Sequence, residues 1–429
     1  MRNEDFPLFT VIIPQKNRAE YIGHTLKTCM IQDYPNFEVI VSDDFSDDNS
    51  VEVISEFVKI DPRIKLYAHS KHLGMRDNFE FALSKVRPGY VMALGGDDGL
   101  CSGAIWKMYS LLKETKRDLL TWPCATFKYP SAEGEESMLY FRRNKNKYQI
   151  IKSEDFLAKI SDSFYYLIDE CPMFYIKGVA ATHLVDRVKS RTDDGNFYHC
   201  PTPDGFSGVV LAGEVDDYVY CSEPLSIGGN TKKSQGQNYM RTDEKSRAEA
   251  EQFFNDNIRR TMHKNLASQP YSPLITLMTA DYLLTAKDLP GWKGKGVNVS
   301  IENLLRKTFS YLVKEPFDNK VLVRELKILR EIAIQHDLVD LYNELFKSTV
   351  RKVVIAQQIK GLVITNSIRI NGEGIGINNV FDAAMFIPSA YLLYRDYANM
   401  HTIINVIING VRVLLREFKY KKENLPQID

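Results

Sequence analysis

Two adjacent carboxylates in a glycine-rich turn are the residues of this chain with the clearest chemical potential. The apolar run 91–94 leads into Gly-Gly-Asp-Asp-Gly at 95–99, so Asp97 and Asp98 follow a short buried strand. Glycines let the backbone approach a ligand closely. Paired acids at a strand end commonly hold a divalent cation, which in turn can hold a phosphate. A plain surface turn is the alternative, because Asp and Gly are also the usual turn residues.

Two further polar pairs follow strand-like segments earlier in the chain. Asn17 and Arg18 come after the run 9–14, and the pair Asp43-Asp44 comes after the run 37–42. In parallel sheets, ligands bind beyond the carboxyl ends of the strands. Three polar clusters at one such edge favour a binding site over three unrelated turns.

The elements that must position these clusters follow an alternating pattern. β-Branched and apolar runs that predict strands alternate with helical patterns of about ten residues; the strands are expected at 9–14, 37–42, 63–68 and 90–94. Such alternation predicts βαβ units, hence an α/β protein with a Rossmann-type, mainly parallel sheet flanked by helices. The less regular stretch that follows, to residue 241, predicts a helix with Ser153 as its N-cap, strands at 174–178 and 216–220, and a loop at 228–237 that could cover an anion.

Bulk composition excludes some classes of protein. The chain has 429 residues, enough for two or three domains, and its 55 basic side chains balance its 55 acidic ones. Zero net charge argues against a nucleic-acid partner. Six dispersed cysteines, an N-terminus without an apolar secretory segment, and the absence of an uncharged apolar run of spanning length predict a cytoplasmic protein.

From about residue 242 the pattern becomes helical, which predicts a separate all-α C-terminal domain at 242–429. Homo-oligomerisation, binding of a long acceptor and docking on a membrane are the open roles for this domain. The amphipathic segment 403–422 ends in a basic cluster. A helix packed on a neighbour with a solvated basic tip is the favoured interpretation, and peripheral contact with the inner membrane face is the alternative.

The order and spacing of the motifs from Val11 to Asp98 carry a family likeness. The elements are Val11-Ile12-Ile13-Pro14 with Asn17-Arg18, the segment 32–41, Asp43-Asp44 with Ser46 and Asp48, Leu73-Gly74 with Asn78, and Gly96-Asp97-Asp98. As a set they resemble the nucleotide-sugar-binding half of family 2 glycosyltransferases of the GT-A fold. A weaker resemblance reaches about residue 236. It implies a GT-A domain at 1–241, with a nucleotide-binding part at about 8–100 and an acceptor part at 101–241.

The resemblance implies an inverting transfer of a sugar from a nucleotide diphosphate-sugar to a hydroxyl of a glycan or lipid-linked acceptor, in bacterial surface polysaccharide or glycan synthesis. The residues implied in binding the nucleotide-sugar are Pro14, Asn17, Arg18, Asp43, Asp44, Asn78, Gly96, Asp97 and Asp98. Asp97 would also bind a divalent metal, Mg²⁺ or Mn²⁺, and Asp204 would be the general base. The chemistry agrees, since the leaving diphosphate needs its charge neutralised and the acceptor hydroxyl must lose a proton.

Two positions depart from the family pattern. Gly95 stands at the first position of the aspartate–any–aspartate metal motif, and Lys16 stands where an aromatic residue is common. The second departure removes base stacking at that position, so the sequence does not identify the nucleotide.

Several alternatives stay open. Asp204 could belong to a Pro-Asp-Gly turn, and its rivals as base are Glu214, Asp216 and Asp217. A catalytically silent nucleotide-sugar-binding or scaffold protein is the alternative to an enzyme. A nucleotidyltransferase is disfavoured because residues 14–18 lack the glycines of a phosphate loop.

Overall fold

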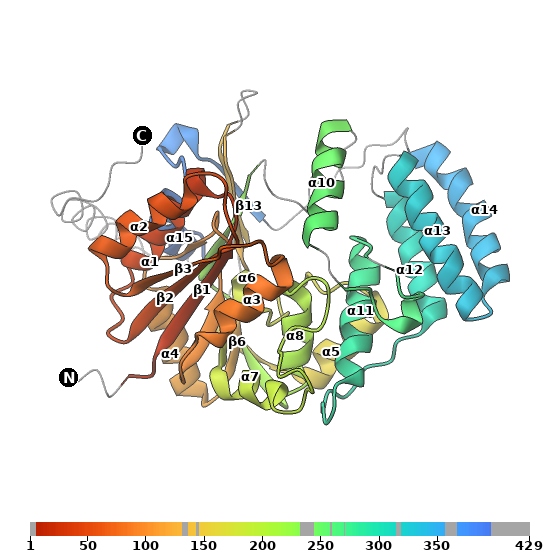
Figure 1. Cartoon of the computed structure of the whole chain (residues 1–429), viewed down its shortest axis with the longest axis horizontal. Coiled ribbons are helices and arrows are strands. Elements are labelled where there is room, and N and C mark those ends of the chain that lie inside the picture. The colour runs from red at the N-terminus through yellow and green to blue at the C-terminus, as the bar shows by residue number, and fades with distance from the viewer. Residues whose placement is uncertain are drawn as a thin grey trace.

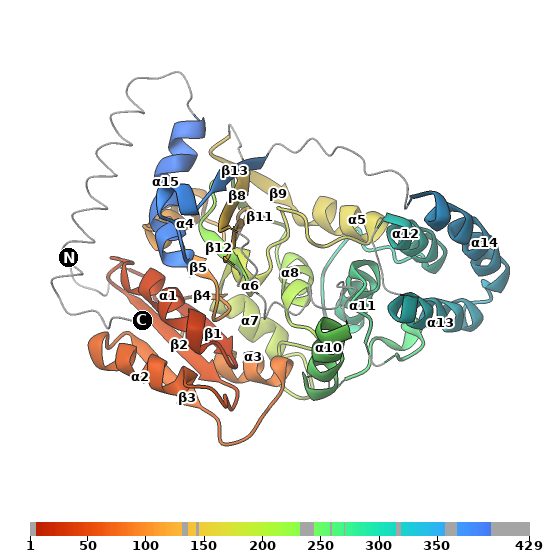
Figure 2. The ribbon, with the colours of Figure 1, turned by 90° about the horizontal axis from the view of Figure 1, so that it is seen from above.

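A computed structural model describes residues 6–130, 136–142, 146–231, 244–257, 260–269, 271–314, 319–356 and 367–395. The described residues form two β-sheets, the helices around them, and a helical region that lies at the far end of the molecule from α1 and α2 (Figures 1 and 2). Two predicted features lie outside the described ranges: residues 232–237 of the loop expected to cover an anion, and the amphipathic segment 403–422.

The nucleotide-binding part has the predicted βαβ arrangement. Its strands are β1 (Phe9–Gln15), β2 (Phe37–Asp43), β3 (Ile64–Ala68) and β4 (Tyr90–Ala93), and its helices are α1 (Ala19–Met30), α2 (Ser50–Ile60) and α3 (Met75–Ser84). The four strands are parallel, in the order β3-β2-β1-β4. The strand order therefore reverses between β1 and β4, which is where ligands bind in open α/β sheets.

Burial on both faces explains why the central strands β1 and β2 read as mainly apolar runs. Val11 and Val39 pack in a cluster with side chains of α1 and α2, whereas Ile12 and Ile40 pack on the other face with Phe79 of α3. Successive strand residues point to opposite faces. Both faces must therefore be apolar, and polar side chains are confined to the ends of the strands.

The large sheet continues beyond β4 as a mixed sheet, in the order β4-β10-β6-β11-β9. These strands are β6 (Leu119–Thr121), β9 (Tyr148–Lys152), β10 (Gly178–Ala181) and β11 (Asp217–Cys221). β10 runs antiparallel to both of its neighbours, and β11 runs parallel to β6. The predicted mixed α/β sheet flanked by helices is thereby confirmed.

The glycine-rich turn at residues 95–99, which contains Asp97 and Asp98 and is called the acid turn below, joins the two sheets. The second sheet contains β5 (Gly99–Leu100), β7 (Ala125–Lys128), β8 (Met138–Arg142), β12 (Ser226–Asn230) and β13 (Ser367–Asn371). Since β4 ends in the large sheet and β5 begins the small one, Asp97 and Asp98 lie at the junction. β12 pairs antiparallel with β5 and so runs beside the turn.

Two local predictions were wrong. The segment 174–178 forms a short helix, α6 (Phe174–Lys177), and β10 begins only at Gly178. Ser153 is the first residue of α5 (Ser153–Ser163), not its N-cap: Lys152 has that position, and the Ser153 hydroxyl has no partner among the described residues. A short apolar run does not distinguish a strand from a buried helical turn, and tertiary contacts decide between them.

The C-terminal region is helical, as predicted. Its helices are α10 (Glu244–Asn257), α11 (Ile275–Asp288), α12 (Ile301–Lys314), α13 (Asn319–Gln335) and α14 (Val339–Ala356). Leu277 and Leu284 of α11 pack with α12 and α13, whereas Tyr282 and Leu283 pack in the cluster under the large sheet. α11 thus joins the two parts of the protein. No helix among the described residues has the length and apolar character needed to cross a bilayer.

Residues 367–395 return to the N-terminal part instead of extending the helical region. β13 pairs antiparallel with β8, and α15 (Val380–Arg395) lies beside α1 in both views (Figures 1 and 2). Val380 and Ile387 belong to the same buried cluster as Ile22 of α1. The Tyr391 hydroxyl donates to the carbonyl of Ser222 at 2.9 Å. The structure thus adds a strand and a helix from the predicted C-terminal domain to the sheets that carry the candidate site.

Candidate functional site

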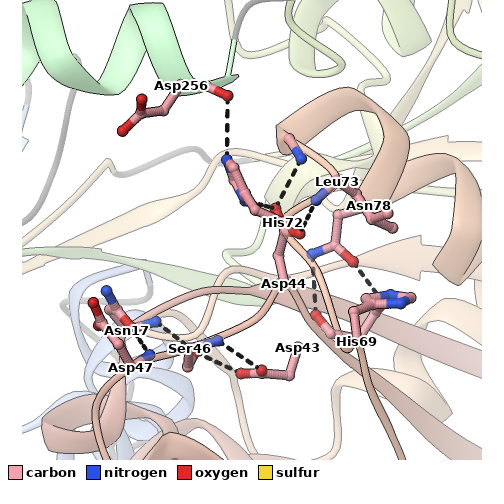
Figure 3. A network of polar contacts seen from close by, with 12 residues as sticks. Asn17, Asp43, Asp44, Ser46, Asp47, His69, His72, Leu73, Asn78 and Asp256 are labelled. Atoms are coloured by element: carbon pink, nitrogen blue, oxygen red, sulfur yellow. Dashed lines mark hydrogen bonds and ion pairs between the residues drawn. The ribbon is translucent and has the colours of Figure 1, made fainter.

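The loops that follow β1 and β2 are tied together by hydrogen bonds (Figure 3). The Asn17 amide donates to Ser46 Oγ at 2.8 Å, and the Asp47 amide donates to Asn17 Oδ1 at 2.9 Å. The Arg18 amide donates to Ser50 Oγ at 2.9 Å. These bonds hold two of the three predicted polar clusters in one unit at the carboxyl edge of the sheet.

Asp43 is the buried carboxylate at the end of β2. It accepts hydrogen bonds from the Ser46 amide at 3.0 Å and the Ser46 hydroxyl at 2.6 Å, and from the side-chain amide of Gln15. A Cβ at Gly96 would lie 3.3 Å from Gln15 Cβ and 2.9 Å from Arg18 Cγ. The Asp43 cluster is therefore continuous with the acid turn, and Gly96 permits the close approach.

Asp44 points away from this unit and braces the loop before α3. Its carboxylate accepts from the amides of Leu73 and Gly74 at 2.6 and 3.1 Å and lies 2.9 Å from His72 Nδ1. His72 Nε2 in turn lies 3.2 Å from the carbonyl of Asp256, at the end of α10 (Figure 3). Its contacts give Asp44 a positioning role.

Asn78, the other predicted binding residue in this area, lies beneath the site. Its side chain accepts from Ser42 Oγ at 2.6 Å and donates to the Ser42 carbonyl at 3.1 Å, and His69 Nε2 lies 3.0 Å from the same hydroxyl. Asn78 is 3% exposed, so it reaches a ligand only through the strand that it supports. Pro14, also buried, is placed on β1 beyond the last residue paired with β4, at the open side of the strand.

The two acids of the turn have different surroundings. Asp98 is buried and accepts from the amides of Gly95 and Gly229 at 2.6 and 2.9 Å and from the Tyr175 hydroxyl. Burial, and then the neighbouring charge of Asp97, raise the pKa of Asp98 to about 7. Asp98 therefore holds the turn in shape.

Asp97 faces the Arg18 side of the site. Its Oδ1 lies 3.8 Å from Arg18 Nε, and its Oδ2 accepts from Thr231 Oγ1 at 3.2 Å. No group of three or more His, Cys, Asp or Glu side chains suited to a metal occurs within the described ranges. A Mg²⁺ ion nevertheless uses one or two protein carboxylates and takes its other ligands from water and phosphates, and Mn²⁺ shares its preference for oxygen ligands. The single carboxylate of Asp97 fits that donor set.

The space around Gly95 explains the first departure from the family pattern. A Cβ at Gly95 would lie 2.7 Å from Asp98 Oδ2 and 3.0 Å from the Tyr175 hydroxyl. The Asp98 carboxylate folds back onto the Gly95 amide and occupies the volume that an aspartate at position 95 would need. The glycine is thus required by the inward orientation of Asp98.

Restoring the family motif with Gly95→Asp is therefore expected to weaken the site. We expect affinity for a nucleoside diphosphate with Mn²⁺ to fall about tenfold or more, because the new carboxylate collides with Asp98 and adds a like charge. Gly374→Asp is the matched control, since no atom lies within 4 Å of a Cβ at Gly374. Isothermal titration calorimetry measures both, and tighter Mn²⁺-dependent binding by Gly95→Asp would contradict the expectation.

Asp204 begins the helix α8 (Asp204–Ala212) instead of forming the Pro-Asp-Gly turn that was its alternative. Burial raises the pKa of its carboxyl to about 6. No other described residue donates a hydrogen bond to this carboxylate. Two of its rivals are in ion pairs: Glu214 with Arg187 and Arg191, and Asp217 with Arg117. Asp216 is exposed at the surface.

Tyr175 is the site residue that sequence reasoning missed. Burial raises its pKa well above the usual range, and the charges of Asp98, Asp97 and Asp204 raise it further. One phenol thus lies within electrostatic reach of all three acids. The sequence predicted a strand for the segment that contains Tyr175, and nothing in that segment indicated that the phenol would lie near the acids. The Gly228-Gly229 pair was predicted in a loop, but it lies in the strand β12. Such a glycine pair can indicate close backbone approach, and here Gly229 lies against the backbone of Asp97.

Comparison with known proteins agrees with this fold. Residues 10–165 match the model of Glycosyl transferase family 2. This part of the chain is therefore similar to family 2 glycosyltransferases, as the motif set predicted.

The individual similarities are distant. The chain is 30% identical over 161 residues to a GalNAc(5)-diNAcBac-PP-undecaprenol beta-1,3-glucosyltransferase of Campylobacter jejuni, covering 37% of this chain and 50% of the relative. It is 32% identical over 108 residues to the putative teichuronic acid biosynthesis glycosyltransferase TuaG of Bacillus subtilis, covering 25% and 40%. A crystal structure of S. aureus TarS 1–349 in complex with UDP aligns with a TM-score of 0.48 at 13% identity, covering 83% and 94%. The chain spans about half the length of the curated relatives that it matches: 56% of an uncharacterized glycosyltransferase of Haemophilus influenzae and 50% of the Campylobacter jejuni enzyme.

Proposed function

We propose that this protein is an inverting glycosyltransferase that moves a sugar from a nucleotide diphosphate-sugar to an acceptor hydroxyl, in bacterial surface polysaccharide or glycan synthesis. One observation carries the proposal. The Tyr175 hydroxyl donates to Asp98, and the charges of Asp97 and Asp98 in the turn after β4 and of Asp204 at the start of α8 all raise the pKa of Tyr175. This supports a site in which the acid proposed for the diphosphate and the carboxylate proposed as base are both within electrostatic reach of one phenol.

In this proposal the donor lies along the edge from Asp43 to Asp97. Asp43, held by Gln15 and Ser46, contacts the nucleoside, and the Arg18 guanidinium and the Gly96 backbone contact the diphosphate. Asp97 would hold a divalent metal, whose charge when bound neutralises the leaving diphosphate. Asp98 keeps the turn in shape through the amides of Gly95 and Gly229.

Asp204 is the proposed base. It takes the proton from the acceptor hydroxyl as the new glycosidic bond forms and the bond to the diphosphate breaks, so the sugar is attacked from the face opposite the leaving group. A pKa of about 6 leaves the carboxylate ionised at neutral pH and still basic enough to accept that proton. An unpaired carboxylate also suits this role better than the ion-paired Glu214 or Asp217.

The printed names of two relatives suggest the acceptor class. One is a glucosyltransferase for an undecaprenol-linked glycan, and the other is assigned to teichuronic acid biosynthesis. We propose a glycan or lipid-linked acceptor for this chain. An acceptor attached to a lipid would also require peripheral contact with the membrane, for which the helical region is a candidate, as it is for homo-oligomerisation.

The test is release of nucleoside diphosphate from a panel of nucleotide-sugars, with Mn²⁺ or Mg²⁺, in the presence of short glycan acceptors. We expect one donor to be turned over and the turnover to be lost in Asp97→Asn and on chelation of the metal. Full turnover in Asp97→Asn would refute the assignment of the diphosphate site. Nucleotide binding without turnover of any donor would instead indicate the silent, nucleotide-sugar-binding scaffold.

A further inference from the structure

Phe45 combines a strained backbone with an exposed ring. It follows the Asp43-Asp44 pair, its φ is +59°, and its side chain is 52% exposed. The left-handed region is unfavourable for residues that carry a Cβ, and a bulky residue there is a genuine outlier. The exposed ring buries little apolar surface that could offset this cost. In the free protein a glycine at position 45 would therefore be more stable.

The neighbouring residues hold this conformation in place. On one side Asp43 and Asp44 are buried, and on the other the Ser46 amide and hydroxyl donate to Asp43. The Ser46 hydroxyl also accepts from the amide of Asn17, in the loop after β1 (Figure 3). Strain of this kind persists where the surrounding bonds over-determine the backbone, and such residues cluster at ligand sites.

The position of Phe45 relates it to the second departure from the family pattern. The bond between Ser46 and Asn17 places Phe45 one residue from a direct contact with the loop that contains Lys16. Lys16 leaves that loop without an aromatic ring. Phe45 supplies an exposed ring at the same edge of the sheet, two residues after Asp43, the carboxylate that we assign to the nucleoside.

We propose that Phe45 is the base-stacking residue of the donor site, with the nucleobase of a nucleoside diphosphate as its ligand. The inference rests on the proposed function, which puts the nucleotide at this edge. Aromatic side chains stack on the π-face that every nucleobase presents, so the contact adds affinity with little dependence on the base. The strain at residue 45 is then retained for binding at the expense of stability.

The test is Phe45→Gly, for which the two effects have opposite signs. We expect the Tm to rise by about 2 °C because the strain is relieved. We expect the Kd for UDP or GDP with Mn²⁺ to rise about tenfold because the stacking contact is lost. Lys116→Gly is the matched control: Lys116 is an exposed residue with φ +54° after α4 (Ala104–Thr115). It should show the same rise in Tm and unchanged nucleotide binding.

A probe without a base separates stacking from a general disturbance of the site. Inorganic pyrophosphate with Mn²⁺ should bind wild type and Phe45→Gly equally, and Phe45→Trp should retain the affinity for UDP and GDP. Equal UDP and GDP affinities in wild type and Phe45→Gly, or an equal loss for pyrophosphate, would overturn the stacking role while leaving the proposed function intact. A wild-type protein that binds no nucleoside diphosphate would overturn the proposed function and this inference together.

Discussion

Asp204→Asn should lower the rate of sugar transfer by about 10²–10⁴-fold, the usual contribution of a general base, while nucleoside diphosphate binding stays close to that of wild type. The amide keeps the size of the side chain but cannot accept the proton of the acceptor hydroxyl. In the wild-type protein the rate should decrease as the pH is lowered below about 6, because the Asp204 carboxylate becomes protonated there. Steady-state rates between pH 5 and 9 measure both effects.

The same substitution should make the protein more stable above pH 6. Burial raises the folded-state pKa of Asp204 from 3.8 to about 6, so the folded state holds its proton more tightly than the unfolded state. Stability is therefore lost as the pH rises from about 4 to 6, and the ionised carboxylate remains unfavourable above that window. We expect Asp204→Asn to raise the free energy of unfolding by about 1–3 kcal/mol at pH 8, with the lower value where solvent screens the charge. At pH 4 the free energy of unfolding should change little.

Glu214→Gln is the matched control, because Glu214 is a rival acid with the opposite electrostatic setting. Its carboxylate is buried and paired with Arg187 and Arg191. Breaking a buried ion pair is destabilising, so this variant should lose stability and keep the pH profile of the rate. Full activity of Asp204→Asn, or a loss of activity in Glu214→Gln alone, would show that a residue other than Asp204 is the base.

Gly229→Ala should disrupt the acid turn from outside. A Cβ at Gly229 would lie 1.8 Å from the backbone carbonyl of Asp97. Because backbone on both sides must move, β12 is pushed away and the Gly229 amide no longer reaches Asp98. We expect a loss of about 1–3 kcal/mol in stability, the usual cost of overpacking, and at least a 100-fold loss, or about 2.7 kcal/mol, in affinity for UDP or GDP with Mn²⁺.

Gly228→Ala is the control one residue earlier. Its Cβ would be crowded by the terminal methyl of Ile176, at 2.9 Å, which can turn aside, whereas Cys124 Sγ and the Ala125 carbonyl lie at ordinary distances of 3.6 and 3.8 Å. The free energy of unfolding of this variant should decrease by less than about 1.5 kcal/mol, and its affinity for the nucleotide should be unchanged. Chemical denaturation and calorimetry on the pair measure the difference, and equal binding by both variants would show that β12 does not shape the site.

Much of the donor half of the site could be predicted from local patterns. The strands β1, β2 and β4 are largely buried on both faces, so they appear as mainly apolar runs that are followed by polar residues. The parallel arrangement then brings Asn17, Asp43 and Asp97 to one edge. The roles of Asp44 and Asn78 could not be predicted in the same way, because a polar side chain at a strand end can face either a ligand or the next loop.

The sequence by itself determined the α/β class, the helical C-terminal region and the edge where the acids gather, because these depend on hydrophobic periodicity and on strand ends. Tertiary structure alone decided which acid braces the turn and that residues 367–395 return to the N-terminal sheets. It also brought Tyr175 within electrostatic reach of Asp97, Asp98 and Asp204. These outcomes rest on contacts between segments far apart in the chain, for which local patterns contain no information. The single glycine at position 95 illustrates the difference: it was a departure from a motif in the sequence, and in the structure it is the space that Asp98 requires.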